Sequence, residues 1–358
     1  MNKILIGGAG GVPSENVIRS LNEGGEKYKI IGMGSEPSDL ILSSAETKYV
    51  VPYANRANYW KVLSGILNKE RPNLLHCQND FEILEVSKIR DSIQSTGTKL
   101  FMPKHETVVN CVDKGLSAGI WERSGITIPK TMNINSPEDL KVAFDKLSKN
   151  DGKIWIRATQ GGGGKGALPT GDFEFAKKWI DQYKGWGGFT AAELLTADTV
   201  TWLSIWYEGE LVVAQGRKRK SWNLGNRTLS GVTGVTGVGE TCSDALVDKT
   251  SIEAILSIDS KPHGIFAVDM TYDVDGIPNP TEINISRFFT TVYFFTKAGL
   301  NMPAIFVDIA LHGKFPVLEK KINPLPEGLL WIRAMDREPL LTTEKEMLEQ
   351  LIIYKDGN

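Results

Sequence analysis

Residues 154–170, IWIRATQGGGGKGALPT, place four consecutive glycines and a lysine directly after a hydrophobic run. The run at 154–158 predicts a β-strand and the amphipathic segment 172–185 predicts a helix, so the glycines join two elements of one unit. Backbone without side chains can turn several peptide N–H groups toward a phosphate, and Lys165 adds a positive charge. We therefore expect a phosphate-binding loop, with a flexible surface connection as the alternative.

Two familiar phosphate-binding motifs do not match the chain. The P-loop requires Ser or Thr directly after its lysine, but Gly166 follows Lys165. The dinucleotide-binding fingerprint requires a third glycine after Gly8 and Gly10, but Pro13 stands at that position. The sequence therefore disfavours a P-loop and an NAD-dependent dehydrogenase.

The composition excludes several classes of protein. The 358 residues are enough for two compact units, and 41 basic against 43 acidic residues give a formal net charge of -2. This balance offers no overall basic surface to nucleic acid or to an anionic membrane. The N-terminal apolar run is too short for a signal peptide, and no run reaches the length of a membrane span. Three separated cysteines form neither a disulfide framework nor a zinc cluster. We expect a cytoplasmic protein without nucleic-acid or membrane partners.

Residues 1–105 alternate strand-like and helix-like segments, which predicts βαβ units around a mainly parallel sheet. The helix expected to follow the first strand begins near Ser14, whose hydroxyl can accept from the exposed N–H groups of a first turn. The expected strands are 3–7, 28–34, 73–78 and 99–103.

From residue 113 onward the pattern changes, and strand pairs come to dominate. Glu208-Gly209 and Asp275-Gly276 each predict the turn of a β-hairpin. This second unit is therefore expected to be α+β rather than doubly wound. Near the C-terminus, the segment 329–341 is expected to add a further strand.

A second cluster of polar residues lies in the hairpin AVDMTYDVDGIPNPTEINISR, residues 267–287. Glu282 and Asn284 are two residues apart on an expected strand, so both side chains point from one face. Asp269, on the preceding strand, joins that face if the turn keeps an even register. Two carboxylates and an amide oxygen suit Mg²⁺, which typically uses one or two carboxylates plus substrate phosphates. The alternative is a solvated hairpin with acidic residues on its wet face.

The order of these features resembles that of the ATP-grasp enzymes, closest to the carbamoyl-phosphate-synthase large-chain-like and carboxylate-amine ligase branch, over residues 1 to about 315. The resemblance implies a fold of class α/β plus α+β. A Rossmann-like pre-ATP-grasp domain would occupy 1–105, and a two-lobed ATP-grasp domain would occupy 106–320. Its lid lobe would span about 113–190 and its metal-binding lobe about 191–320, with 321–358 as a C-terminal extension.

The resemblance also implies which residues bind ATP and Mg²⁺, or Mn²⁺ in its place. Lys114 and Arg157 would contact the nucleotide, and the loop would cover the β and γ phosphates through Gly161, Gly162, Gly163, Gly164 and Lys165. The adenine would meet Glu193, Leu194 and Leu195. The family's ribose acid is replaced here by Thr199 and Val200, and Asp198 is the nearest substitute. The metal ligands would be Asp269, Glu282 and Asn284.

Three arginines and Lys165 are the expected catalytic groups. Arg287 resembles the arginine that steadies the γ-phosphate or an acyl phosphate, although the family spaces its pair as N-x-R and this chain has NISR. In the basic run 216–222, Arg217 and Arg219 fall on one face of an expected strand and Lys218 on the other. We expect the two arginines to bind a substrate carboxylate, and a solvated strand is the alternative.

The reaction implied is an ADP-forming ligation. A small-molecule carboxylate would become an acyl phosphate, and an amine or similar nucleophile would then displace phosphate. Two alternatives are a phosphotransferase that stops after phosphoryl transfer and a nucleotide-binding protein without turnover. A homodimer is a possible assembly.

Overall fold

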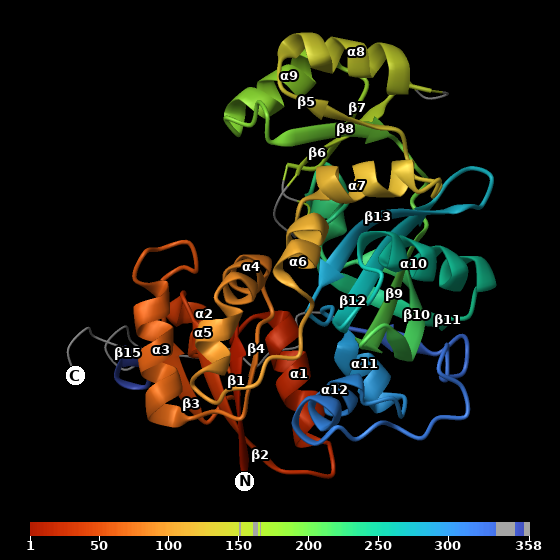
Figure 1. Ribbon diagram of the computed structural model, residues 1–358. Coiled ribbons are helices and arrows are strands. Elements are labelled where there is room, and N and C mark those ends of the chain that lie inside the picture. Colours follow the sequence, from red (N-terminus) through yellow and green to blue (C-terminus); the bar gives the residue numbers. More distant parts are fainter. Residues whose placement is uncertain (150–151, 160–163, 165, 334–347, 354–358) are drawn as a thin grey trace.

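The computed structural model describes residues 1–149, 152–159, 164, 166–333 and 348–353, and their strands form three sheets. Figure 1 shows one sheet near both ends of the chain, a large one beside it, and a small one at the far end of the molecule. The arrangement has both parallel and antiparallel sheets, as the α/β plus α+β class requires.

The first sheet is parallel throughout, in the order β15-β3-β2-β1-β4. Its strands are β1 (Asn2–Gly7), β2 (Tyr28–Gly34), β3 (Thr47–Val50), β4 (Leu74–His76) and β15 (Ile352–Ile353). The helices between them are α1 (Val12–Asn22), α2 (Pro37–Leu40), α3 (Tyr59–Glu70), α4 (Asp80–Lys88) and α5 (Arg90–Gln94). The doubly wound pattern predicted for residues 1–105 is confirmed.

Two local predictions in this region are wrong. Ser14 does not cap α1, because the helix begins earlier with Gly11 as its N-cap, and the Ser14 hydroxyl donates to the carbonyl of Gly8 at 2.6 Å. Residues 99–103 do not form a strand beyond a single bridge from Lys99 to Leu74. The apolar side chains of this segment serve packing instead, since the Phe101 ring stacks on Phe306 with centroids 4.9 Å apart.

The largest sheet is antiparallel, in the order β13-β12-β9-β10-β11-β14. Glu208 and Gly209 both have positive φ, 49° and 95°, and make the tight turn between two strands, as expected. The strands are β9 (Thr199–Tyr207), β10 (Glu210–Trp222), β11 (Thr236–Cys242), β12 (Gly264–Tyr272), β13 (Pro278–Ile285) and β14 (Leu330–Ile332), with a 3₁₀ turn at Gly225–Arg227. Strand β14 confirms the strand predicted within 329–341.

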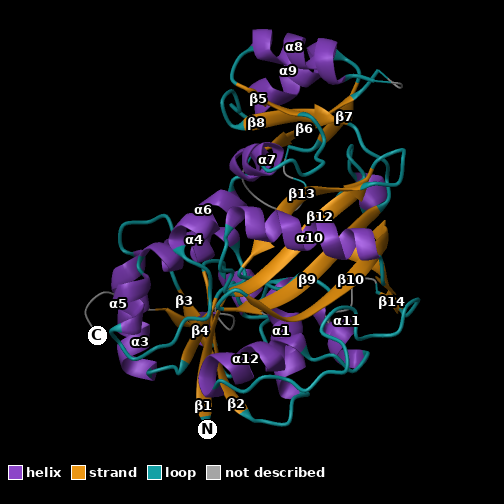
Figure 2. Ribbon diagram, turned by 45° about the vertical axis from the view of Figure 1, so that its right-hand side comes forward, coloured by secondary structure: helices purple, strands orange, loops and turns teal. Residues whose placement is uncertain are grey.

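Both faces of this sheet are buried. Along β9, Trp202 and Trp206 join one hydrophobic cluster, whereas Leu203 and Ile205 between them join another. Figure 2 shows α10 lying across the first face. The helices on the first side are α6 (His105–Val112), α7 (Lys114–Arg123) and α10 (Ala245–Ile258), and those on the second are α1, α11 (Val292–Lys297) and α12 (Met302–His312). Both clusters also contain residues of β1, so the first two sheets share their cores.

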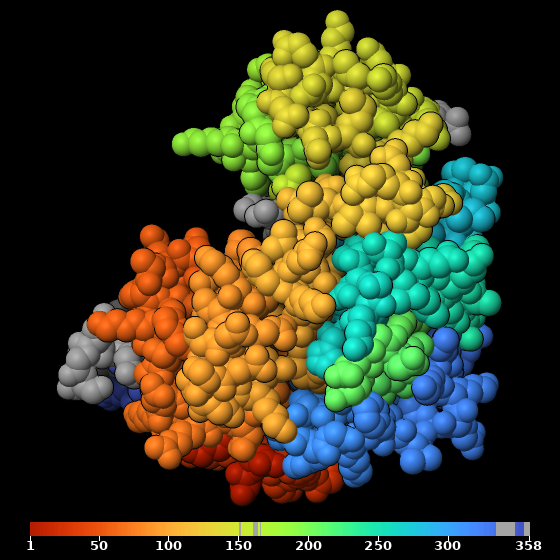
Figure 3. Space-filling view, in the orientation of Figure 1, coloured from red at the N-terminus to blue at the C-terminus, as the bar shows by residue number. Residues whose placement is uncertain are grey.

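The third sheet, β5-β8-β6-β7, has a hydrophobic cluster of its own. Ser136 and Asp172 cap its two helices by accepting from Asp139 N and Phe175 N. The elements are β5 (Thr131–Ile134), α8 (Pro137–Leu147), β6 (Ile154–Ala158), β7 (Leu168–Thr170), α9 (Phe173–Gln182) and β8 (Phe189–Glu193). In Figure 3 this unit projects at the top of the molecule. No described helix has the length and apolarity to span a bilayer.

Gly7 allows close packing against a buried acid, and Gly10 allows the backbone at Asp39 to approach closely. A Cβ on Gly7 would lie 2.2 Å from Oε2 of Glu82, and one on Gly10 would lie 1.9 Å from the carbonyl oxygen of Asp39. Glu82 is buried, and it accepts from Asn79 Nδ2 at 2.8 Å and from the Tyr59 hydroxyl at 3.3 Å. Burial raises the pKa of Glu82 to about 7, although these hydrogen bonds oppose the rise.

This raised pKa predicts a specific pH dependence of stability. The protonated acid stabilises the fold below its ordinary pKa of 4.5, and that contribution is lost as the pH rises through about 7. We expect the free energy of unfolding to fall over this interval by at most about 3 kcal/mol, and Glu82→Gln to abolish this component. Urea unfolding at about pH 5 and about pH 8.5 measures the difference. Glu85→Gln on the same helix should behave as wild type, and an unchanged pH dependence in Glu82→Gln would contradict the assignment.

Candidate active site

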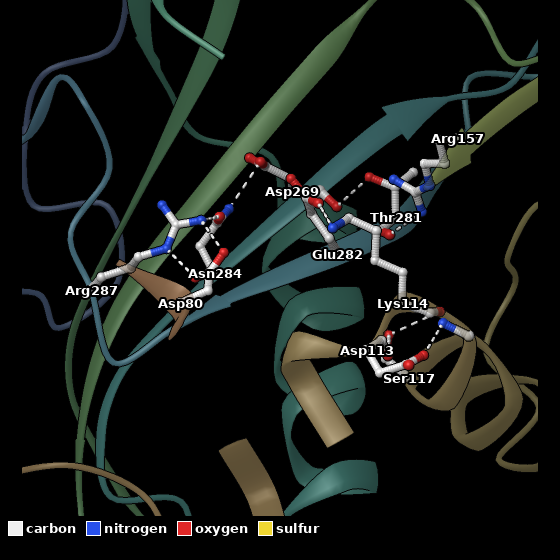
Figure 4. Close-up of polar contacts among 11 residues, drawn as sticks. Asp80, Asp113, Lys114, Ser117, Arg157, Asp269, Thr281, Glu282, Asn284 and Arg287 are labelled. Carbon is white, nitrogen blue, oxygen red and sulfur yellow. Dashed lines mark hydrogen bonds and ion pairs between the residues drawn. The ribbon is translucent and has the colours of Figure 1, made fainter. Parts of the chain in front are cut away.

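The acidic hairpin has the register predicted for it. Asp269 on β12 lies directly opposite Glu282 on β13, and Asn284 is two residues further along the same strand. Ile283 and Ile285, which alternate with them along β13, are buried, so the polar residues share the other face. Figure 4 shows Asp269 and Glu282 at the centre of a polar cluster, with Arg287 at one end and Arg157 at the other.

Asp269 accepts two hydrogen bonds and forms one ion pair. The Thr201 hydroxyl on β9 donates to Oδ1, and Asn284 Nδ2 donates to Oδ2 at 3.0 Å. Arg219 Nη2, on β10, lies 3.6 Å from Oδ1. The carboxylate is therefore fixed by neighbours on three different strands.

Glu282 pairs with a lysine from a different part of the fold. Lys114 is the first residue of α7, and its Nζ lies 3.1 Å from Oε2 of Glu282. The helix start is fixed by Asp113, whose carboxylate accepts from Gly115 N at 2.9 Å. Burial alone would raise the pKa of Glu282, but the charges of Lys114, Arg157 and Arg287 outweigh it and hold that pKa well below its ordinary value. Glu282 is thus an anion at neutral pH.

Arg157 connects the small sheet to this hairpin. It projects from β6, and its Nη2 donates to the backbone carbonyl of Thr281 at 2.7 Å. Burial lowers the pKa of Arg157, and the nearby charges of Glu282 and Asp269 oppose that shift. The strand that precedes the glycine loop therefore brings a cation to the acidic pair.

Arg287 is held by a carboxylate from the first sheet's side of the molecule. Its Nε donates to Oδ1 of Asp80 at 2.7 Å, and its Nη2 donates to the Asn284 amide oxygen. The extra residue in NISR is Ser286, which has φ of 55°. This left-handed residue reverses the chain locally, so that Arg287 reaches Asn284 despite the added residue. Asn284 as placed turns its oxygen to Arg287 and its amide nitrogen to Asp269.

A polar cavity joins most of these groups. Its lining combines side chains from α4, α6, α7 and β13 with Arg287, which lies two residues beyond β13: Asp80, Cys111, Val112, Lys114, Glu282, Ile283, Asn284 and Arg287. Sequence reasoning missed Asp80, although it stands just beyond the carboxyl end of β4, where parallel sheets commonly place functional residues. It also missed Thr201, for which the sequence carries no evident signal.

The remaining nucleotide-binding predictions fall at the junction of two sheets. Glu193 ends β8, where its Oε1 lies 2.9 Å from Lys149 Nζ. Leu194 and Leu195 begin the connection to β9, and Asp198 in that connection is exposed. Gly161, Gly162, Gly163 and Lys165 lie outside the described residues. Gly164 is described: its φ is 73°, and a Cβ there would lie 3.1 Å from the carbonyl oxygen of Val232.

Arg217 and Arg219 point from one face of β10, as predicted. Arg217 is only 1% exposed and Arg219 is nearly as enclosed, so the solvated-strand alternative is wrong for both. Their hydrogen-bond partners are mainly threonine hydroxyls, from Thr199, Thr201, Thr236 and Thr291.

The carboxylate oxygens of Asp269 and Glu282 could supply part of the ligand shell of a magnesium ion. Asp269 and Glu282 present carboxylates on one face, and Mg²⁺ characteristically binds one or two carboxylates and completes its shell with phosphates and water. Among the described residues, no group of three or more His, Cys, Asp and Glu side chains forms a full metal cage.

The chain resembles solved structures by fold. It matches L-amino acid ligase from Bacillus licheniformis at 12% identity and TM-score 0.66, over 87% of this chain and 74% of that one. Biotin carboxylase from Campylobacter jejuni matches at 15% identity and TM-score 0.66, covering 88% and 72%. Carboxyaminoimidazole ribonucleotide synthase from Aspergillus clavatus, complexed with ATP, matches at 12% and 0.67, covering 90% and 79%. By sequence, no protein-family model and no curated protein matches the chain.

The Arg287–Asp80 ion pair predicts a measurable loss of stability. In Asp80→Asn, Arg287 keeps its partly buried charge but loses its carboxylate, and we expect the free energy of unfolding to fall by about 1–3 kcal/mol. Urea unfolding measures this. Asp91→Asn is the control, because Asp91 also lies in the first turn of a helix but is exposed. Equal losses in the two variants would assign the effect to the helix terminus rather than to the ion pair.

Proposed function

We propose that this chain, which has the ATP-grasp fold, is an ADP-forming ligase that activates a small-molecule carboxylate for attack by an amine or similar nucleophile. ATP would lie between the small sheet and the large antiparallel sheet. In this proposal residues 1–105 form the pre-ATP-grasp domain, and residues 106–320 form the lid and metal-binding lobes.

One observation carries the proposal: the site holds more positive than negative charge. Five basic side chains meet three carboxylates in the described part of the site, namely Lys114, Arg157, Arg217, Arg219 and Arg287 against Asp80, Asp269 and Glu282. Buried charge requires compensation, and a triphosphate supplies several negative charges at once. Among the similar solved structures, one is a complex with ATP and another is a complex with ADP and magnesium.

Asp269 and Glu282 would hold Mg²⁺, or Mn²⁺ in its place. Asn284, which donates to Asp269 and accepts from Arg287, would be a further ligand or would orient these two side chains. When bound, the metal neutralises phosphate charge and aligns the γ-phosphate. Lys114, now paired with Glu282, would turn to the phosphates when the metal takes over that acid. The adenine would meet Glu193 and the backbone of Leu194 and Leu195, with Asp198 near the ribose.

The chemical step then needs alignment and neutralisation rather than an enzyme nucleophile. A carboxylate oxygen of the substrate attacks the γ-phosphorus, the bond to the β-phosphate oxygen breaks, and ADP leaves. Arg157, Arg287 and Lys165 spread the developing charge on the transferred group. The amine then attacks the acyl carbon, the carbon–oxygen bond to phosphate breaks, and inorganic phosphate and a proton are released. The glycine loop over the phosphates would exclude water that hydrolyses the acyl phosphate.

A screen for ADP release tests the proposal. Purified protein with Mg²⁺ and ATP is offered amino acids and other small carboxylates, with and without amines. We expect one acid to stimulate ADP release, and Glu282→Gln to lower that rate by about 10²-fold or more, since it removes a metal-binding charge. Glu253→Gln, at an exposed position on α10, should retain full activity. No stimulation by any acid would favour a nucleotide-binding protein without turnover.

Trapping with hydroxylamine separates a ligase from a phosphotransferase. Hydroxylamine attacks an acyl phosphate at the acyl carbon, so a ligase supplied with its acid should yield a hydroxamate detectable by iron complexation or mass spectrometry. A phosphotransferase would instead accumulate a phosphorylated product that resists hydroxylamine. That second outcome would agree with the proposed ATP site but would refute the proposed ligation.

A further inference from the structure

The loop between β4 and α4 meets the chain just after β13 at two consecutive residues. Asp80 pairs with the Arg287 side chain, and Gln78 Oε1 accepts from the backbone N–H of Phe288 at 3.1 Å. Gln78 is only 5% exposed and Phe288 is fully buried, so their hydrogen bond is shielded from water. The parallel sheet thus holds both the side chain of Arg287 and the backbone beside it.

His76 fixes the orientation of the Gln78 amide, whose Nε2 lies 2.9 Å from His76 Nε2. A backbone N–H can only donate, so Phe288 must face the amide oxygen and His76 must face the amide nitrogen. That nitrogen also only donates, so His76 Nε2 accepts and the ring proton lies on Nδ1. Burial lowers the pKa of His76 to about 3, so the ring is neutral and can accept at neutral pH.

His76 is itself held firmly in place. It ends β4, where it lies opposite Ile6 of β1 in the parallel sheet. Its ring centroid lies 4.8 Å from that of Phe306 on α12 and 5.7 Å from that of Phe288. A continuous chain of packed and hydrogen-bonded groups therefore runs from the centre of the parallel sheet, through His76 and Gln78, to the residue after Arg287.

The turn that presents Arg287 needs such support, because it contains an unfavourable backbone conformation. Ser286 is buried and has φ of 55°, a left-handed value that is disfavoured for a residue with a Cβ. Its N–H donates to the carbonyl oxygen of Ile265 at 2.8 Å, and two residues later the N–H of Phe288 donates to Gln78. Removing the Gln78 oxygen would leave a buried N–H unsatisfied and would release one side of this turn.

We propose that Gln78, oriented by His76, is a positioning residue for Arg287. By fixing the turn at Ser286, it keeps the guanidinium at the polar cavity that Arg287 and Glu282 line together. For its catalytic consequence the inference rests on the proposed function, in which Arg287 spreads the charge of the transferred phosphoryl group. The positioning itself is a property of the protein without substrate, and it is tested in that state.

Nuclear magnetic resonance of the Arg287 side chain tests the positioning. Its Nε–H signal in nitrogen-labelled protein is identified by its loss in Arg287→Lys, and its exchange with water is slowed by the hydrogen bond to Asp80. We expect Gln78→Met to accelerate this exchange about fivefold or more, because the variant frees the N–H of Phe288. His76→Phe keeps an aromatic ring but removes the acceptor, and it should accelerate the exchange to a smaller extent. Unchanged exchange in Gln78→Met would overturn the proposal.

Gln215→Met is the matched control. Gln215 is also a buried glutamine with two backbone partners, since it donates to the carbonyl of Gly216 at 3.0 Å and accepts from the N–H of Leu325 at 3.1 Å. We expect this variant to unfold at lower urea concentration, as Gln78→Met does, but to leave the Arg287 exchange as in wild type. Equal acceleration in both variants would assign the effect to lost stability. If Gln78→Met does not fold, Gln78→Asn, which shortens the reach of the amide, carries the same expectation.

Kinetics in an active enzyme separate positioning from a general structural role. Gln78→Met should lower kcat at least about tenfold and leave KM for ATP within about twofold of wild type. The same substitution added to Arg287→Met should have little further effect, because Gln78 acts through that arginine. Equal losses in both backgrounds would contradict the proposal. Faster Arg287 exchange in Gln78→Met without ADP release by any acid would support positioning and refute the ligase, whereas ADP release with unaltered exchange would do the reverse.

Discussion

Two carboxylates placed directly opposite each other across a strand pair are the constraint on which the candidate site depends. Asp269 and Glu282 repel each other in this position, and such like-charge pairs destabilise a sheet unless cations accompany them. The chain brings those cations from distant elements: Lys114 from α7, Arg157 from β6 and Arg219 from β10. The repulsion between these two carboxylates thus favours packing of the cation-bearing elements against this hairpin. A bound metal ion would also offset the repulsion.

The hydrophobic packing divides the molecule into two parts, one with a shared core and one with a core of its own. The parallel and the large antiparallel sheets share two hydrophobic clusters, because the side chains of β1 and of β9 alternate between them. The small sheet has its own cluster and meets the acidic hairpin through polar contacts such as Arg157 to Thr281. In the proposed reaction, this distribution would let the small unit approach a nucleotide and release it while Asp269 and Glu282 stay fixed on the large sheet.

The sequence was informative where spacing alone determines geometry. The two-residue spacing of Glu282 and Asn284 and the Asp275-Gly276 turn predicted a shared face, and the order of motifs predicted the ATP-grasp fold that similar structures confirm. Ser14 misled because several residues near a helix start can cap it, and contacts with Gly8 decide which one does. Asp80 was missed because its role arises from a contact with Arg287, which is 207 residues away in the chain.

The last described strand has a consequence for how the protein avoids aggregation. Strand β15 is only two residues long, but it pairs in parallel with β3 and so covers one border of the parallel sheet. An uncovered strand border offers free N–H and C=O groups to another molecule. Residues 352–353 thus cover the edge of β3. A shortened protein without them would keep every residue of the candidate site, but it would expose the β3 edge, to which strands of other molecules could add.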